Sequence, residues 1–195
     1  MRSKNIELVE AKADDAGQFT ALAAVFGNID NQGDRVMPGA FSETLRKWRD
    51  SGDEIPVIFS HQAQDLFAWI GTADPNDIRE TAQGLVVNGK LDVTDNPTAR
   101  QVAKLMKRGN LKGWSYGYTV PAGGETIAED GANDLHRIDL IEVGPTLRGA
   151  NREARTLAVK SMDDLPDRCR LRSLDELAAR RKSSAPVRVA EYAID

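Results

Sequence analysis

Ser115 and His61 are the two residues whose types and order could carry out covalent chemistry. Ser115 lies between two glycines in the run GWSYG, residues 113–117, and His61 precedes it by about fifty residues. A neutral imidazole can take the proton of a serine hydroxyl during attack on a carbonyl and later give it to the leaving amine. The pair therefore predicts acyl transfer, with Ser115 as the nucleophile and His61 as the general base.

The run GWSYG also matches G-x-S-x-G, the nucleophile elbow of α/β-hydrolases, but its surroundings do not match. An elbow has an apolar strand before the serine and a helix after it, whereas here a helical segment precedes and the strand-like run 116–121 follows. The elbow also places its histidine well after the serine, and His136 follows Ser115 by only about twenty residues. We therefore expect a hydrolase with the order His then Ser on another fold, with a small-molecule esterase as the alternative.

The strand expected at 111–120 separates its aromatic residues from Ser115, because side chains alternate between the two faces of a strand. The face with Ser115 otherwise carries only glycine and threonine, which leaves room for a substrate backbone. Close packing against a neighbouring strand would explain the same pattern.

His61 is expected at the end of a strand covering 55–61, on the same face as Val57 and Phe59. A lone histidine in such a place is usually a structural residue held by hydrogen bonds. Its catalytic interpretation therefore depends on Ser115.

The strand-like run 135–147 carries three candidates for the residue that orients His61, namely Glu142, His136 and Asp139. Alternation places Glu142, Leu140 and His136 on one face and Asp139 on the other. Glu142 lies between apolar residues, and a carboxylate there needs a partner, either the catalytic histidine or an arginine. A carboxylate stabilises the imidazolium formed during attack, whereas a neutral histidine stabilises that charge less.

The elements that must position these residues are mostly strands. Seven stretches are rich in β-branched or aromatic residues and bounded by turn formers, and they cover residues 6–11, 17–26, 55–61, 66–73, 84–93, 113–120 and 135–147. The polar run 129–134 predicts a hairpin turn between the last two. Helices are expected at 39–49 and at 96–108, the latter capped by Asp95 or Asn96. The pattern predicts a mainly β chain with flanking helices (α+β), built on a roughly seven-stranded, closed or nearly closed barrel.

Composition limits the class of protein. The 195 residues carry a net charge of −4, which gives no indication of nucleic-acid binding. No apolar run approaches the ~20 residues of a membrane helix, and the N-terminus lacks an apolar signal core, so a cytoplasmic protein without membrane partners is expected. Cys169 is the only cysteine of the sequence, so an internal disulfide is excluded and a zinc site made of cysteines cannot form. The run 28–34 resembles the start of a calcium loop, but Gly39 stands where the bidentate glutamate of such a loop would be. An Asx-rich turn is therefore predicted, and no metal or cofactor is expected.

Five segments, in their order, resemble the prohead proteases of tailed bacteriophages, relatives of the herpesvirus assemblin serine proteases. They are GNIDNQGDRVMPGAF at 27–41, VIFSH at 57–61, DVTDNPTARQVAKLMKRGNLKGWSYGY at 92–118, LIEVGPTLRGAN at 140–151 and RTLAVKS at 155–161. Their joint order and spacing carry the resemblance. The chain departs from the family at Gly144, where a serine usually follows the Glu-Val pair.

The resemblance implies an assemblin-like β-barrel with Ser115 as nucleophile and His61 as general base. Glu142 aligns with the third catalytic position, which assemblins fill with a second histidine. The implied oxyanion donors are backbone N–H groups in the loop that begins Arg148-Gly149, helped by the charge of Arg148.

The implied activity is peptide hydrolysis through an acyl-enzyme, without metal or cofactor, inside the procapsid in the host cytoplasm. The implied substrates and partners are the scaffold protein, the N-terminal scaffolding segment of the major capsid protein, and the protease itself. A catalytically silent scaffolding protein on the same fold is the alternative, which the presence of both Ser115 and His61 disfavours.

Residues 1–160 are expected to form the barrel domain and residues 161–195 a C-terminal tail with one short helix. We expect the tail to be dispensable for the barrel and to bind scaffold or capsid protein, with a helix docked on the barrel as the alternative. The cleavage site stays open, and so does the oligomeric state, for which a homo-oligomer is one of the alternatives.

Overall fold

The computed structural model describes residues 17–159. The strand expected at 6–11, Cys169 and the tail 161–195 lie outside these described residues.

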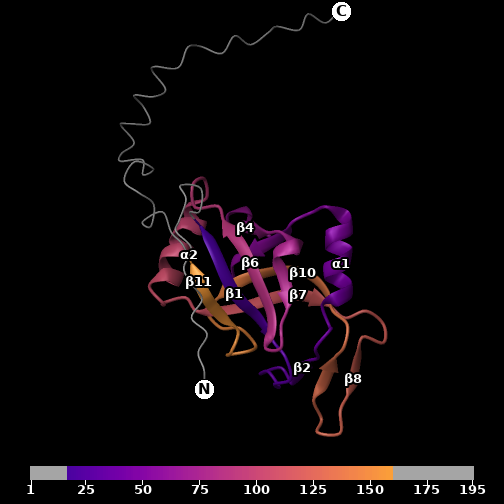
Figure 1. Ribbon diagram of the computed structural model, residues 1–195. Helices are drawn as coiled ribbons and strands as arrows, with labels where there is room; N and C mark the ends of the chain where they lie inside the picture. The colour runs from indigo at the N-terminus through magenta and orange to yellow at the C-terminus, as the bar shows by residue number, and fades with distance from the viewer. Residues whose placement is uncertain (1–16, 160–195) are drawn as a thin grey trace, which may run out of the picture.

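Seven strands close into a barrel, as the sequence predicts (Figure 1). In spatial order they are β1 (Gln18–Val25), β11 (Arg155–Val159), β7 (Gly113–Thr119), β10 (Asp139–Thr146), β3 (Ile55–Ile58), β4 (Trp69–Ala73) and β6 (Gly84–Leu91). β6 pairs back with β1 and closes the barrel, while the short β5 (Ile78–Glu80) extends the sheet beside β6. Neighbouring strands run antiparallel except β10 and β3, which are parallel.

A second, three-stranded sheet projects from one end of the barrel, where Figure 1 shows β8 reaching away from the other strands. It contains β2 (Asp34–Val36), β9 (Asn133–Leu135) and β8 (Glu125–Ile127). The polar turn expected between the strands of Ser115 and Glu142 instead joins β8 to β9. That prediction was wrong because two short strands intervene before β10 begins.

Two helices flank the barrel near the expected positions. α2 (Pro97–Lys107) begins after Asn96, whose side chain accepts hydrogen bonds from two backbone N–H groups of the first turn, and Pro97 needs no such partner. α1 (Ser42–Ser51) begins three residues later than expected because Gly39 has a φ of +92° and lies in a turn. Glu80 caps its start by accepting from the backbone N–H of Phe41 and from the hydroxyl of Ser42.

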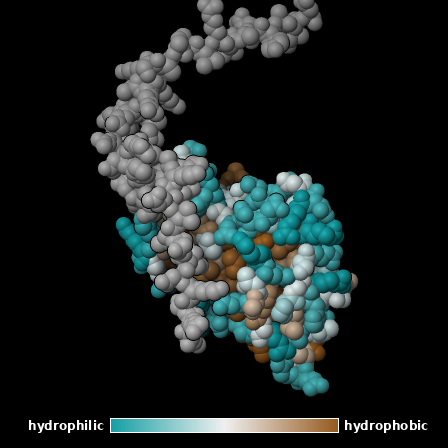
Figure 2. Space-filling view, viewed as in Figure 1, coloured by the Kyte–Doolittle hydropathy of each residue, from teal (hydrophilic) through white to brown (hydrophobic). Residues whose placement is uncertain are grey.

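The barrel interior is apolar and holds the aromatic face of β7. Trp114 is fully buried, and its ring centroid lies 4.8 Å from that of Phe19. Phe41 packs edge-on against Tyr116 at 5.3 Å. The aromatic face of the Ser115 strand is therefore the core face, as expected. On the face shown in Figure 2, hydrophilic side chains cover most of the surface around a few apolar patches.

No helix between residues 17 and 159 is long and apolar enough to cross a membrane.

Two predicted strands are interrupted at places that matter for the site. The strand expected at 55–61 ends at Ile58, and Phe59–His61 forms the 3₁₀ turn η1. The run 135–147 is split between β9 and β10, and residues 136–138 are not in a strand. The strand faces expected for His61 and His136 are therefore wrong, because alternation assumed continuous strands.

Candidate active site

His61 lies in a turn with an unusual backbone. Ser60 and His61 have φ values of 51° and 59°, the left-handed region that side chains disfavour. Such residues cost on the order of 1–3 kcal/mol each and persist where the surroundings hold them. The turn follows β3 directly, and β3 is paired with β10 through Val57 and Val143. This pairing brings the His61 turn beside the strand that carries Glu142.

A β-bulge determines where Glu142 points. Leu140 pairs with Tyr118 and Glu142 pairs with Gly117, so Ile141 is an extra residue in β10. Without the bulge, Glu142 would share the core face of Leu140. The bulge moves Glu142 to the opposite face of the sheet, where Ser115 also lies. The sequence-based assignment of Glu142 and Leu140 to one face is therefore wrong.

Helix α1 anchors β10 next to this bulge. The hydroxyl of Thr44 accepts a hydrogen bond from Leu140 N at 3.0 Å, and the indole of Trp48 donates to Leu140 O at 2.9 Å. Both backbone groups of Leu140 are thus bonded to side chains of α1. These bonds fix the strand immediately before the residue that the bulge redirects.

Glu142 and His61 form a short hydrogen bond, with 2.5 Å between Glu142 Oε1 and His61 Nδ1. Glu142 is only 4% exposed, and its Oε2 is buried without a hydrogen-bond partner among the described residues. A buried carboxylate so poorly satisfied gains from a neighbouring positive charge. The hydrogen bond raises the pKa of His61; partial burial opposes this effect and the charge of Glu142 adds to it. The pair can therefore stabilise an imidazolium.

Ser115 and His61 line the same cavity, which has a volume of about 120 Å³. Residues at the end of β1, residues of β7 and residues of the segment 28–36 line this cavity. The Ser115 hydroxyl forms no hydrogen bond with His61 within the part of the chain that the structure describes. Catalytic hydrogen bonds are often long without substrate and tighten when it binds. Since Nδ1 is bonded to Glu142, Nε2 is the nitrogen left to accept the Ser115 proton.

Two glycines allow this arrangement, and sequence reasoning missed their roles. A Cβ at Gly117 would lie 2.6 Å from Glu142 Oε1, so the second glycine of GWSYG makes room for the Glu142 carboxylate. A Cβ at Gly144 would collide with Ile58 O, which lies at the end of β3 just before the His61 turn. The G-x-S-x-G match pointed to Gly117 as part of a nucleophile elbow, not as space for Glu142. Gly144 stood out in the sequence only as a departure from the resemblance.

The loop expected to supply oxyanion donors packs beside Ser115. A Cβ at Gly149 would lie 2.5 Å from the carbonyl oxygen of Trp114, so the loop backbone touches β7 immediately before Ser115. Ala150 lines the Ser115 cavity. Arg148 and Gly149 do not line it, but they line a neighbouring cavity of about 540 Å³.

The two other candidates for the third position lie elsewhere. His136 Nε2 is hydrogen-bonded to the hydroxyl of Thr126 at 2.8 Å, on the projecting sheet. Asp139 accepts from Lys47 on α1 at 2.9 Å. Among the hydrogen bonds and ion pairs of residues 17–159, neither residue contacts His61 or Glu142, so of the three candidates the geometry brings only Glu142 to the imidazole.

The run 28–34 forms the expected Asx-rich turn. Asp30 Oδ1 accepts from the backbone N–H groups of Gln32 and Asp34 at 2.8 and 3.1 Å. Among the described residues, no group of three or more His, Cys, Asp or Glu side chains could hold a metal ion.

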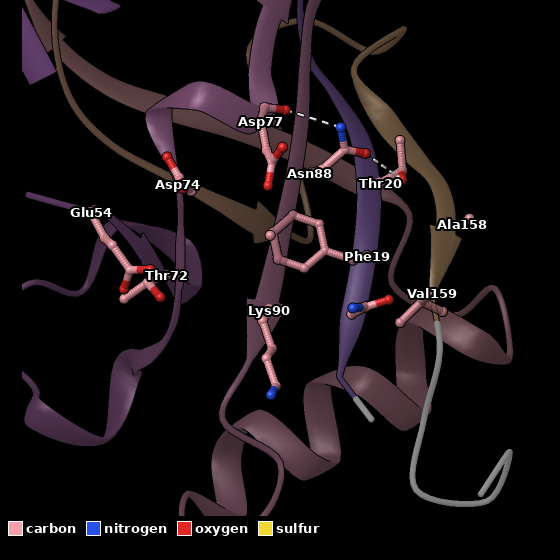
Figure 3. Close-up of a pocket in the computed structure, with 12 residues that line it drawn as sticks. Phe19, Thr20, Glu54, Thr72, Asp74, Asp77, Asn88, Lys90, Ala158 and Val159 are labelled. Carbon is pink, nitrogen blue, oxygen red and sulfur yellow. Dashed lines mark hydrogen bonds between the residues drawn. The ribbon is translucent and has the colours of Figure 1, made fainter. Parts of the chain in front are cut away.

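A larger cavity of about 510 Å³ lies on another part of the barrel, next to β1, β6 and the end of β11 (Figure 3). Carboxylates of Glu54, Asp74 and Asp77 and the amine of Lys90 line it. Its lining includes no serine, cysteine or histidine.

Comparison with known proteins identifies the family. The profile of the family described as caudovirus prohead serine protease matches residues 4–167. The prohead protease of Enterobacteria phage HK97 is 30% identical over 149 residues, which make up 76% of this chain and 63% of that protein. The chain therefore belongs to the caudovirus prohead serine protease family, which confirms the resemblance seen in the sequence. It spans about 63% of the length of the HK97 relative.

A crystal structure of KSHV protease in complex with a hexapeptide phosphonate inhibitor is also similar, with a TM-score of 0.39 and 11% identity. The match covers 72% of this chain and 63% of that one. A superposition this loose does not support comparison of individual residues.

Proposed function

We propose that this protein is a serine endopeptidase of procapsid maturation, with Ser115 as nucleophile, His61 as general base and Glu142 as the residue that orients His61. The observation that carries the proposal is the shared cavity of Ser115 and His61, with His61 hydrogen-bonded to the buried Glu142 on its far side. Membership of the prohead serine protease family supports the same activity.

In the proposed reaction, Ser115 Oγ attacks the scissile carbonyl carbon while His61 Nε2 takes the hydroxyl proton. Glu142 stabilises the resulting imidazolium through its bond to Nδ1. The negative oxygen of the tetrahedral intermediate accepts hydrogen bonds from backbone N–H groups of the loop 148–150. His61 then gives the proton to the leaving amine. Water next attacks the acyl-enzyme while His61 takes its proton, and His61 returns that proton to Ser115 Oγ as the acid product leaves.

The proposed substrates are the scaffold protein or the N-terminal scaffolding segment of the major capsid protein, with self-cleavage in addition, and the proposed site of action is the procapsid in the host cytoplasm. These proposals rest on the family, in which proteins are described by their action on the prohead. The protein's partners are accordingly its capsid and scaffold proteins.

A catalytically silent scaffolding protein is the second candidate, because the structure holds Ser115 and His61 without a direct hydrogen bond between them. The two candidates differ in one observable, which is the N-terminus of the capsid protein after co-expression with this chain. Mass spectrometry of that N-terminus should reveal a truncated capsid protein. Full-length capsid protein with both the native chain and Ser115→Ala would favour the silent scaffold.

A further inference from the structure

The loop beside Ser115 is fastened to a segment more than a hundred residues away in sequence. Asn28 Nδ2 donates to Asn151 Oδ1 at 3.2 Å, and Asn151 Nδ2 donates to Asn28 Oδ1 at 2.8 Å. A third bond joins the same two segments, from the backbone N–H of Asn31 to the carbonyl oxygen of Ala150 at 3.1 Å. The two asparagine amides thus satisfy each other with a donor and an acceptor on each side.

The same loop also lies against β7. Gly149 approaches the carbonyl oxygen of Trp114 so closely that no side chain fits between them. The loop therefore contacts both the Asn28 segment and the strand that carries Ser115. Its position relative to the nucleophile depends on both contacts.

Both asparagines line the Ser115 cavity. Within residues 17–159, their side-chain hydrogen bonds go to each other and to Glu153, and none goes to Ser115 or His61. They are therefore placed to control the geometry of the cavity wall without joining the proton transfer. Preorganised donors accelerate acyl transfer because they need not reorient as the oxyanion forms. A displacement of about 1 Å in such a site can cost about 10²-fold in rate.

We propose that Asn28 and Asn151 are positioning residues, which hold the loop 148–151 against β7 so that its backbone N–H groups face the oxyanion. The catalytic part of this proposal rests on the proposed protease activity. The mechanical part, that the amide pair immobilises the loop, does not depend on it.

Removing either amide should loosen the loop. Asn28→Ala and Asn151→Ala should each lower kcat about 10- to 100-fold with little change in KM, because the oxyanion forms only in the transition state. The double variant should lose little more than either single variant, since each asparagine is the other's partner. Asn28→Asp keeps the acceptor for Asn151 Nδ2 and loses the donor, so its kcat should lie between those of the native protein and Asn28→Ala.

Asn88→Ala is the matched control, because Asn88 also joins separate elements with its amide. Its Oδ1 accepts from the hydroxyl of Thr20 at 2.7 Å and its Nδ2 donates to Asp77 O at 3.0 Å, both beside the other cavity (Figure 3). Its removal costs the protein a comparable pair of bonds away from Ser115. Asn88→Ala should leave kcat unchanged.

Amide hydrogen exchange tests the mechanical part whether or not the protein is active. Exchange of the backbone amides of residues 148–151 should speed up in Asn28→Ala and Asn151→Ala and stay unchanged in Asn88→Ala. Unchanged exchange in both asparagine variants, a rise in KM with native kcat, or an equal loss of kcat in Asn88→Ala would each overturn the proposal. If the native protein neither cleaves capsid protein nor reacts with a peptidyl phosphonate, the protease proposal fails, and the exchange rates alone decide whether the amide pair holds the loop.

Discussion

Gly117 lies directly opposite Glu142 in the register of β7 and β10, and the space beside its Cα is filled by the Glu142 carboxylate. The last glycine of GWSYG therefore leaves space for a side chain of the neighbouring strand β10. It lets a buried carboxylate reach the imidazole of His61 across the face that carries Ser115.

Gly117→Ala should displace Glu142, because the new methyl group would lie 2.6 Å from Oε1. We expect a loss of kcat of about 10²-fold or more, since small displacements in a catalytic site have effects of that size. Thr119→Ala, an exposed position on the same face of β7, is the control and should keep native activity. Steady-state kinetics on a capsid-derived peptide measures both. Native kcat in Gly117→Ala would mean that the position of Glu142 is unimportant.

Gly144→Ser should destabilise the folded protein. Its Cβ would collide with the carbonyl oxygen of Ile58, so β3 and β10 must separate or shift. Overpacking of this kind costs about 1–3 kcal/mol, which lowers Tm by several degrees in a chain of this size. Thermal unfolding measures the change. An unaltered Tm would show that the two strands have room to adjust.

Part of this arrangement could be predicted from the sequence, and the limits have physical causes. The Asn96 cap, the aromatic core face of β7 and the closed barrel follow from local propensities and from alternation. The bulge at Ile141 could not be predicted in this way, because an extra residue in a run of apolar side chains does not change the local sequence pattern. Glu142 was chosen for its charge, and the strand face assumed for it was wrong.

The position of His61 shows a second limit. The apolar run that ends in FSH predicts a continuous strand. The structure instead ends the strand at Ile58, and Ser60 and His61 adopt a left-handed backbone. Packing of this turn against β10 holds it, since Ser60 does not favour a left-handed backbone. The pair Asn28 and Asn151 shows the same limit, because contacts between residues so far apart leave no periodicity in one sequence.

Glu142→Gln should lower activity steeply and move its pH dependence. Loss of the acid of such a triad costs about 10⁴-fold in kcat in serine proteases. The bond to Glu142 raises the pKa of His61, and His61 must be neutral to act as a base. In the native protein the acidic limb of kcat/KM should therefore lie above the usual histidine range, and in Glu142→Gln it should move to lower pH.

The pH profile of residual activity measures this shift, and His136→Ala is its control because that imidazole bonds Thr126 on the projecting sheet. His136→Ala should keep the native profile. Loss of activity in His136→Ala together with native activity in Glu142→Gln would assign the third catalytic position to the second histidine.

Truncation after Lys160 should leave the barrel folded. The last barrel strand, β11, ends at Val159 and is already paired with β1 from Phe19 to Leu22. Circular dichroism and thermal unfolding should therefore match the full chain, while incorporation into procapsids is expected to fall. An unfolded truncated chain would show that residues beyond 160 complete the domain.

Covalent trapping shows directly whether Ser115 is the nucleophile. A peptidyl diphenyl phosphonate reacts with a serine only when a neighbouring base activates it. After trypsin digestion, the account predicts an adduct on the peptide 113–137, in which Ser115 is the only serine. The adduct should be absent from Ser115→Ala and formed far more slowly by His61→Ala. Capsid protein cleavage by the native chain with no adduct at Ser115, or an adduct on another residue, would contradict the account.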